Sequence, residues 1–461
     1  MEQSFHSFRK DLAKMKNLKQ EGGTLYDYEE ALEKVRAKLA EKLGSILENQ
    51  TNEEKNAQTV KDKEALRNKM ATYKGYISDI VFAENIRVRK YEENNIHDFI
   101  DEMVQEFAGY SILAPAFNDP EVSDIFVIQW DLIFVEKNGK NVKYPYKFRS
   151  PKHFKDTLER FLREAGKEIN DGDQKIVDFE LYGDRGCATA QKVSPKDFSL
   201  TIRKHAEDHI TRDQIVNWGV LNEKMSDLLG MLIAGESNII YAGLTGSGKT
   251  TTIRAMLDYY VTKANKRMLV CEDTQELFPE NEHTLQLVSV KSDDSKLRVT
   301  LGQLIITALR LKPKYIIVGE VRGEEAQAAV EGMETGHSTI FTMHGGNPWN
   351  IINRLVTKYL MAMPSLGIDV VERIIGSSLD YICIQDNIPG IGRKCTSISE
   401  VTYNFETRRI ELKTICRYDF KTKDFVFEGK ISRDKADTMM RRGITWEELA
   451  PWIEDEETMA A

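Results

Sequence analysis

The residues best suited to chemistry form the run GLTGSGKT at positions 243–250. This run fits the pattern G-x-x-x-x-G-K-[ST], in which glycines let backbone N–H groups converge on phosphate oxygens. An apolar stretch at 238–242 precedes the run and favours a buried strand, while residues 251–257 contain no helix breaker. Strand, glycine turn and helix suit phosphate binding, because the positive end of the helix then faces the anion. The sequence therefore predicts a site for a nucleoside triphosphate.

Two side chains of this run have specific expected roles. Lys249 would reach the β- and γ-phosphates, and the Thr250 hydroxyl would hold Mg²⁺. The positions that we expect to contact the nucleotide are Gly243, Thr245, Gly246, Ser247, Gly248, Lys249, Thr250 and Thr251.

Acidic residues and a histidine follow other apolar stretches of the same region. These stretches predict buried strands at 268–271, 315–318 and 339–342. Glu276 comes shortly after the first, Glu320 after the second and His344 after the third. If the strands are parallel, their carboxyl ends share the sheet edge where open α/β sheets bind ligands. We therefore expect these three side chains beside the phosphate-binding loop.

The elements that must position these residues alternate between strand and helix, which indicates an α/β domain with a parallel sheet at about 221–461. One predicted helix, at 300–311, ends before Pro313. Residues 111–205 show a mixed pattern with strands at 122–128, 132–135 and 198–202. In that region Asn138-Gly139 indicates a hairpin turn. Helical spacing is shown there by Phe154, Leu158, Phe161 and Leu162.

The first 110 residues favour a helical extension. One amphipathic helix is predicted by the helical spacing of Tyr28, Leu32, Val35, Leu39, Leu43 and Ile46. Asp27 and Glu30 read as its capping box, and Phe99, Ile100, Met103 and Phe107 predict a second helix. Residues 49–67 favour a solvated loop or helix surface. We expect this arm to pack on its own domain rather than to dock to a partner. A linker is predicted at 206–220. The tail at 430–461 is expected to form a packed terminal helix with a frayed end rather than a docking element.

Composition narrows the class of protein further. The chain has 461 residues, 41% hydrophobic and 30% charged, with a net charge of −9. That charge argues against a generally basic nucleic-acid binder. No run of eighteen apolar residues is present, so no transmembrane segment is expected, and the start shows no signal-peptide core. Five scattered cysteines without a C-x-x-C pair favour a reducing cytosol over a disulfide framework.

Several motifs together resemble one known family. The run CEDTQE at 271–276 resembles its acidic Asp box, IIVGEVRG at 316–323 its Walker B segment, and TGHSTIFTMH at 335–344 its His box. With the phosphate-binding loop, in this order, they resemble the type II/type IV secretion ATPase superfamily. The runs LTIRK at 200–204 and DPEVSDI at 119–125 resemble the branch that serves tight-adherence (Flp, CpaF-type) pili and conjugative transfer. The resemblance spans about residues 110–405 and leaves out the N-terminal arm and the acidic tail.

The resemblance implies a RecA-like P-loop NTPase domain with a parallel-rich sheet, preceded by a smaller α+β domain and the helical arm. It implies a homo-hexameric ring that hydrolyses ATP with Mg²⁺ at the cytoplasmic face of the plasma membrane. Its partners would be inner-membrane platform or secretion-channel proteins, with no direct nucleic-acid binding. Pilus extrusion, pilus retraction and conjugative secretion stay open.

The resemblance also implies roles for individual side chains. Glu276 would polarise the attacking water, and Glu320 would act on Mg²⁺ or on that same water. His344 would sense the γ-phosphate or stabilise the active edge, with His337 a weaker candidate. The expected arginines are Arg203, reaching ATP from the preceding domain, and Arg310 or Arg322 as arginine fingers. For Arg310 and Arg322 a surface ion pair is nearly as good an interpretation.

Two departures from related enzymes bear on this interpretation. Gly319 stands where many phosphate-loop ATPases carry a Walker B aspartate, which weakens any analogy to generic helicases. A C-terminal paired-cysteine zinc motif is missing, which favours the conjugation or Flp-pilus branch. The alternatives from other classes are a DNA-translocating RecA-like ATPase, which needs a basic, aromatic-lined strand path, and a nucleotide-gated assembly scaffold.

Overall fold

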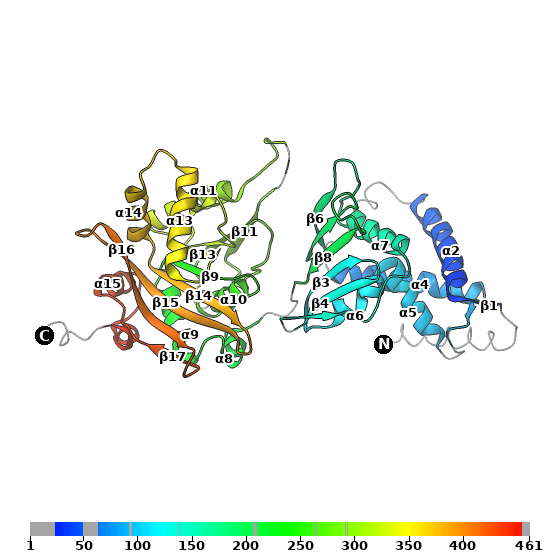
Figure 1. Cartoon of the computed structure of the whole chain (residues 1–461), viewed down its shortest axis with the longest axis horizontal. Helices are drawn as coiled ribbons and strands as arrows, with labels where there is room; N and C mark the ends of the chain where they lie inside the picture. Colours follow the sequence, from blue (N-terminus) through cyan, green and yellow to red (C-terminus); the bar gives the residue numbers. More distant parts are fainter. Residues whose placement is uncertain are drawn as a thin grey trace. The chain divides into compact units, whose positions relative to one another are not determined.

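The structure is a computed structural model that describes residues 24–48, 63–91, 95–137, 139–205, 210–262, 265–290, 292 and 294–453. The chain divides into two compact units, Met1–Glu207 and Asp208–Ala461 (Figure 1). Each unit is described below by itself.

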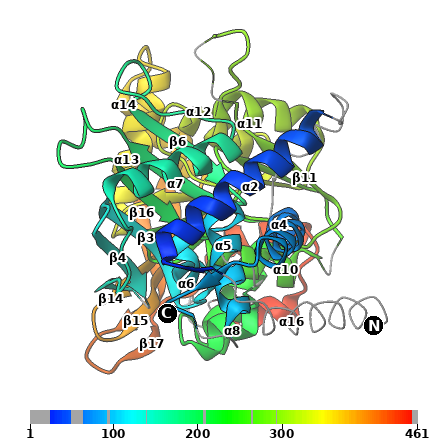
Figure 2. The ribbon, with the colours of Figure 1, turned by 90° about the vertical axis from the view of Figure 1, so that its right-hand side faces the viewer.

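The first unit begins with packed helices. Its elements here are β1 (Leu25–Tyr26), α2 (Tyr28–Glu48), α4 (Lys63–Ala83), β2 (Arg87–Val88) and α5 (Ile96–Ala108) (Figure 2). Leu32 and Val35 of α2 are buried against Ile77 of α4 and Phe99 of α5, so both predicted helices are confirmed. Glu30 Oε2 accepts the Asp27 N–H at 3.2 Å, which is one half of the expected capping box. Residues 49–62 of the expected polar stretch lie outside the described residues.

The rest of the first unit is an antiparallel sheet with helices. Its elements are η1 (Ser111–Leu113), α6 (Ala114–Asn118), β3 (Val122–Gln129), β4 (Leu132–Lys137), β5 (Lys140–Lys143), α7 (Pro151–Glu164), β6 (Ile176–Leu181), β7 (Asp184–Thr189) and β8 (Ser199–Arg203). The strand order is β5-β4-β3-β8-β7-β6. The predicted stripe of α7, including Phe154 and Phe161, is fully buried in the core of this sheet. The sequence did not indicate β6 and β7.

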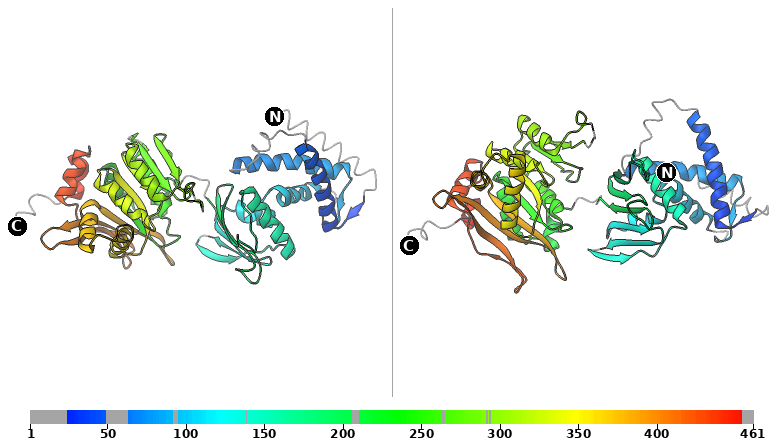
Figure 3. Two further views of the ribbon diagram at one scale, coloured as in Figure 1. Left: turned by 90° about the horizontal axis from the view of Figure 1, so that it is seen from above. Right: turned by 45° about the horizontal axis from the view of Figure 1, so that its top comes forward.

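The second unit is built on a nine-stranded sheet of order β11-β10-β12-β13-β9-β14-β15-β16-β17. Its strands are β9 (Ile239–Gly243), β10 (Met268–Glu272), β11 (Thr284–Val288), β12 (Tyr315–Val318), β13 (Ser338–His344), β14 (Tyr381–Ile388), β15 (Gly392–Asn404), β16 (Arg409–Asp419) and β17 (Asp424–Phe427). From β11 to β14 all neighbours run parallel, and from β14 to β17 they run antiparallel. The predicted parallel sheet is confirmed, and the long antiparallel extension is new (Figure 3).

Helices cover both faces of this sheet (Figure 1). They are α8 (Arg212–Asn217), α9 (Glu223–Ala234), α10 (Lys249–Tyr260), α11 (Leu301–Arg310), α12 (Glu325–Glu334), α13 (Pro348–Ala362), α14 (Ile368–Ser378), α15 (Arg433–Arg441), α16 (Trp446–Leu449) and η3 (Ala450–Trp452). Alternate residues of β9 point to opposite cores, with Ile239 on the face of α9 and α10 and Ile240 on the face of α11 to α14. The strand is therefore buried on both sides, as its continuous apolar run requires.

Two segments of the second unit differ from or extend the sequence expectations. Part of the expected linker at 206–220 forms α8, whose Ile215 is buried in the second unit's core. The described part of the tail packs on the same core through Met439, Leu449 and Ile453. That agrees with the expected packed terminal helix, while residues 454–461 lie outside the described residues. None of the helices that the structure describes combines the length and the apolar character of a membrane span.

Candidate functional site

The loop at 243–250 has the backbone that phosphate binding needs. Gly246 and Gly248 have φ values of 76° and 87°, in the left-handed region that favours glycine. Gly248 is the N-cap of α10 and makes no side-chain cap, so the first N–H groups of the helix face out of its N-terminus. A Cβ at Gly243 would lie 1.9 Å from the Gln385 carbonyl oxygen, so glycine is required there for space.

Lys249 lies folded over this loop. Its Nζ donates to the Gly243 and Leu244 carbonyl oxygens at 3.0 and 3.1 Å. Burial lowers the pKa of Lys249, and the charges of Glu320 and Glu276 oppose that shift. The two carboxylates are thus close enough to act on the ammonium group. An incoming phosphate would replace the carbonyl oxygens as its partner.

The ends of β12 and β13 bring Glu320 and His344 together. His344 is the last residue of β13 and lies in register with Gly243 of β9. His344 Nε2 is 2.8 Å from Glu320 Oε1, and Arg322 Nη2 donates to Glu320 Oε2 at 2.5 Å. Burial lowers the pKa of His344, the Lys249 charge lowers it further, and the Glu320 charge opposes both. The lowered pKa of His344 favours the neutral imidazole.

Glu276 follows β10, the strand beside β12. Its side chain is half-buried, and its charge raises the pKa of both Lys249 and Arg322. Because β10, β12, β13 and β9 are consecutive parallel neighbours, their carboxyl ends meet at one edge. The structure thus brings Glu276, Glu320 and His344 to the edge that holds Lys249.

Three further candidate residues belong to other elements. Arg203 belongs to the first unit, where its Nε donates to Asp124 Oδ1 at 3.0 Å. Arg310 is exposed at the end of α11, before β12, and His337 directly precedes β13. Both therefore lie at the amino edge of the parallel sheet, opposite Glu320 and His344. This topology contradicts an in-subunit role at the phosphates for Arg310 and His337.

Two further side chains that the sequence did not indicate contact the loop. Gln385 of β14 is fully buried; its Nε2 donates to the Ser247 carbonyl oxygen at 2.5 Å, and its Oε1 accepts from the Tyr241 hydroxyl at 2.5 Å. Arg393 of β15 donates from Nε to the Gly246 carbonyl oxygen at 3.1 Å. A polar residue directly after the apolar run 381–384 is the signal that would have found Gln385, since β14 ends at the same sheet edge.

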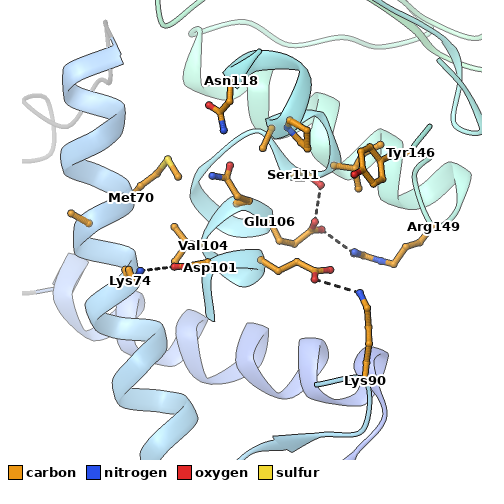
Figure 4. Close-up of a pocket in the computed structure, with 16 residues that line it drawn as sticks. Met70, Lys74, Lys90, Asp101, Val104, Glu106, Ser111, Asn118, Tyr146 and Arg149 are labelled. Carbon is orange, nitrogen blue, oxygen red and sulfur yellow. Dashed lines mark hydrogen bonds and ion pairs between the residues drawn. The ribbon is translucent and has the colours of Figure 1, made fainter. Parts of the chain in front are cut away.

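A separate polar cluster lies beside a cavity of about 750 Å³ in the first unit, lined mainly by α4, α5, η1 and α6 (Figure 4). Glu106 accepts hydrogen bonds from Ser111 Oγ at 2.7 Å and Arg149 Nη2 at 2.9 Å, and lies 2.7 Å from His153 Nε2. Burial alone would raise the pKa of Glu106, but His153 and Arg149 lower it to about 2. Because His153 Nδ1 accepts the Arg149 backbone N–H, its Nε2 carries the hydrogen and cannot take a proton from Ser111. This cluster is not a nucleophilic triad.

Comparison with known proteins places this geometry in a family. The family model described as type II/IV secretion system protein matches residues 193–458. The chain belongs to this family. The matched residues begin shortly before β8 of the first unit and include nearly all of the second unit.

Individual relatives of the secretion family cover different shares of the chain. An uncharacterized protein of Methanocaldococcus jannaschii is 33% identical over 278 residues, which is 59% of this chain and 49% of that protein. The probable conjugal transfer protein TrbB of Sinorhizobium fredii is 28% identical over 70% of this chain and 96% of its own length. The X-ray structure of the Legionella pneumophila ATPase DotB is similar at 20% identity, with a TM-score of 0.45, over 68% of this chain and 81% of that one. The chain thus spans about half the length of the first of these relatives.

Proposed function

We propose that this chain is an ATP-hydrolysing motor of a secretion, pilus-assembly or conjugative transfer machine. The observation that carries the proposal is the convergence of Lys249, Glu276, Glu320 and His344 at one edge of the parallel sheet. A phosphate loop alone would bind nucleotide. The added carboxylates beside it supply what hydrolysis needs.

The loop would hold the triphosphate of ATP through its backbone. The N–H groups of Lys249, Thr250 and Thr251 open the helix α10 without intrahelical acceptors, so phosphate oxygens can accept from them. Gly246 leaves open space, since a Cβ there would meet nothing within 4 Å. The remaining contacts proposed for the nucleotide come from Gly243, Thr245, Ser247 and Gly248.

Mg²⁺ fits the donors at this edge. The Thr250 hydroxyl and the Glu320 carboxylate offer oxygen ligands, which this ion prefers. When bound, Mg²⁺ would neutralise charge on the phosphates.

The protein's own residues would act on the attacking water. Glu276 would orient this water and accept its proton, because a carboxylate at the mouth of the loop can hold a nucleophile in line. Glu320 would support this through Mg²⁺ or the water, and neutral His344 would sense the γ-phosphate or brace Glu320. Arg203 would contribute from the first unit.

We further propose that the motor is a homo-hexamer at the cytoplasmic face of the plasma membrane, working with platform or channel proteins. Support comes from family membership and from relatives named as conjugal transfer and type IV secretion proteins. Pilus extrusion, pilus retraction and conjugative secretion fit equally. The alternatives of a DNA translocase and a nucleotide-gated scaffold predict different biochemistry.

Steady-state ATPase activity, measured together with mass in solution with and without ATP, tests the proposal. We expect a hexamer that hydrolyses ATP and loses turnover, but not ATP binding, in Glu276→Gln. Zero turnover in an assembled ring would support the scaffold instead. DNA-stimulated turnover that falls steeply with salt would support the translocase.

A further inference from the structure

The end of β10 carries a buried carboxylate that binds backbone rather than solvent. Glu272 is 2% exposed, and its Oε1 accepts the N–H groups of Glu276 and Leu277 at 3.0 and 3.1 Å. Residues 273–281 form neither helix nor strand, so no regular ladder fixes the backbone that carries Glu276. The Glu272 side chain therefore supplies the acceptor that secondary structure does not. Leu277, buried in the core at 1% exposure, anchors the next residue.

A glycine on the neighbouring strand end makes room for this carboxylate. A Cβ at Gly319 would lie 2.9 Å from Glu272 Cγ and 3.3 Å from its Oε1. Gly319 is held in place from both sides, because its N–H donates to the Cys271 carbonyl oxygen at 2.9 Å and its own carbonyl accepts from Thr342 Oγ1 at 2.5 Å. It has no positive φ, so backbone freedom is not the reason for glycine here. An aspartate at this position would collide with Glu272.

We propose that Glu272 is a positioning residue for hydrolysis, and that Gly319 is glycine because Glu272 occupies the space beside it. Glu272 would act by fixing the backbone of Glu276, which would act on the water. This proposal rests on the proposed function of Glu276. It also explains why the residue before Glu320 is not acidic.

Positioning and general structural support have different kinetic signatures. Glu272→Ala removes the acceptor and lets the backbone at Glu276 shift, and a shift of about 1 Å lowers turnover about 10²-fold. Because Lys249 and the loop stay in place, ATP affinity should be unchanged.

In a Glu276→Gln background, Glu272→Ala should cause no further loss of kcat, since its effect passes through Glu276. Glu272→Gln keeps an acceptor oxygen and should lose less turnover. Glu282→Ala, at an exposed carboxylate of the same unit, is the control.

A thermal double-mutant cycle tests the contact without using activity. Gly319→Ala should lower Tm by about 2–8 °C through overpacking, and Glu272→Ala should relieve that loss because it removes Cγ. Gly302→Ala is the matched control, since a Cβ there would meet its nearest atom at 3.8 Å.

The two readouts separate the possible failures. Additive Tm changes overturn the assignment of Gly319 to Glu272. Additive losses of kcat, or loss of ATP affinity in Glu272→Ala, overturn the positioning role. A wild-type chain without turnover would overturn the proposed function, and the Tm cycle would still decide the contact.

Discussion

His344 Nε2 lies 2.8 Å from Glu320 Oε1, at the carboxyl ends of two neighbouring strands. The charge of Glu320 favours a protonated imidazole, yet burial and the Lys249 charge prevail and lower the pKa of His344. A neutral imidazole leaves Lys249 and Arg322 as the cations beside Glu320. The pKa of His344 therefore depends on its burial and on Lys249 more than on Glu320.

This balance predicts a pH dependence of stability. The pKa of His344 is lower in the folded state than its ordinary value of 6.5. As the pH falls, the unfolded chain therefore binds a proton at this histidine before the folded protein does. The contribution of His344 to the free energy of unfolding is therefore complete above pH 6.5. It decreases as the pH drops from 6.5 towards the pKa of His344 in the folded state. His344→Gln should lose less stability than the wild type between pH 7.5 and 5.5, measured by urea unfolding. Equal pH slopes in both proteins would contradict the lowered pKa. His337→Gln provides the comparison, since burial lowers the pKa of His337 too, at the opposite edge.

Lys249→Ala tests the phosphate-binding loop. The substitution removes the ammonium group that would meet the phosphates, and we expect turnover to fall by at least about 10²-fold. ATP affinity, measured with a fluorescent nucleotide, should fall as well. Lys296→Ala, at an exposed lysine of the same unit, should change neither quantity. Wild-type turnover in Lys249→Ala would refute the assignment of the loop.

The sequence predicted the strands and helices with regular apolar patterns, and the residues that meet at one edge of the parallel sheet. Continuous apolar runs marked β9, β10, β12 and β13, because strands covered on both faces must be apolar throughout. Because open α/β sheets bind ligands at the carboxyl ends of their strands, the sequence also predicted that Glu276, Glu320 and His344 lie beside the loop. The stripes of α2 and α7 were equally direct signals of buried helix faces.

Contacts between distant segments were not predictable. Gln385 and Ser247 are 138 residues apart, and only the pairing of β14 with β9 brings them together. The family resemblance offered roles for Arg310 and His337, but the topology places both at the amino edge, away from the phosphate-binding loop of the same subunit. Of the two strands that were not predicted, β6 does alternate buried apolar and exposed charged residues from Val177 to Leu181, whereas β7, with the sequence DRGCAT, has no apolar alternation.

Gln385→Leu tests the contact that the sequence did not reveal. The change leaves the Tyr241 hydroxyl and the Ser247 carbonyl without their 2.5 Å partner, and unsatisfied buried groups of this kind cost about 1–3 kcal/mol. ATP affinity should also fall, because the loop loses a support for its backbone. Tyr241→Phe keeps the bond to Ser247 and should retain affinity. A Gln385→Leu protein with unchanged stability and unchanged ATP affinity would show that the phosphate-binding loop keeps its conformation without this contact.

Arg322 and Arg310 give the sharpest contrast among the candidate arginines. Arg322 Nη2 donates to Glu320 at 2.5 Å, and its positive charge acts on the pKa of Lys249, whereas Arg310 is exposed at the opposite edge of the sheet. Arg322→Ala should lower kcat by about 10²-fold, because a positive charge beside the phosphates is lost. Its stability should change by less than about 1 kcal/mol, since the Arg322 side chain is 66% exposed and exposed ion pairs contribute little. Arg310→Ala should leave the kcat of an isolated subunit unchanged. If Arg310→Ala lowers turnover only in the assembled oligomer, Arg310 acts on a neighbouring subunit, and its place at the amino edge of its own sheet is then no obstacle.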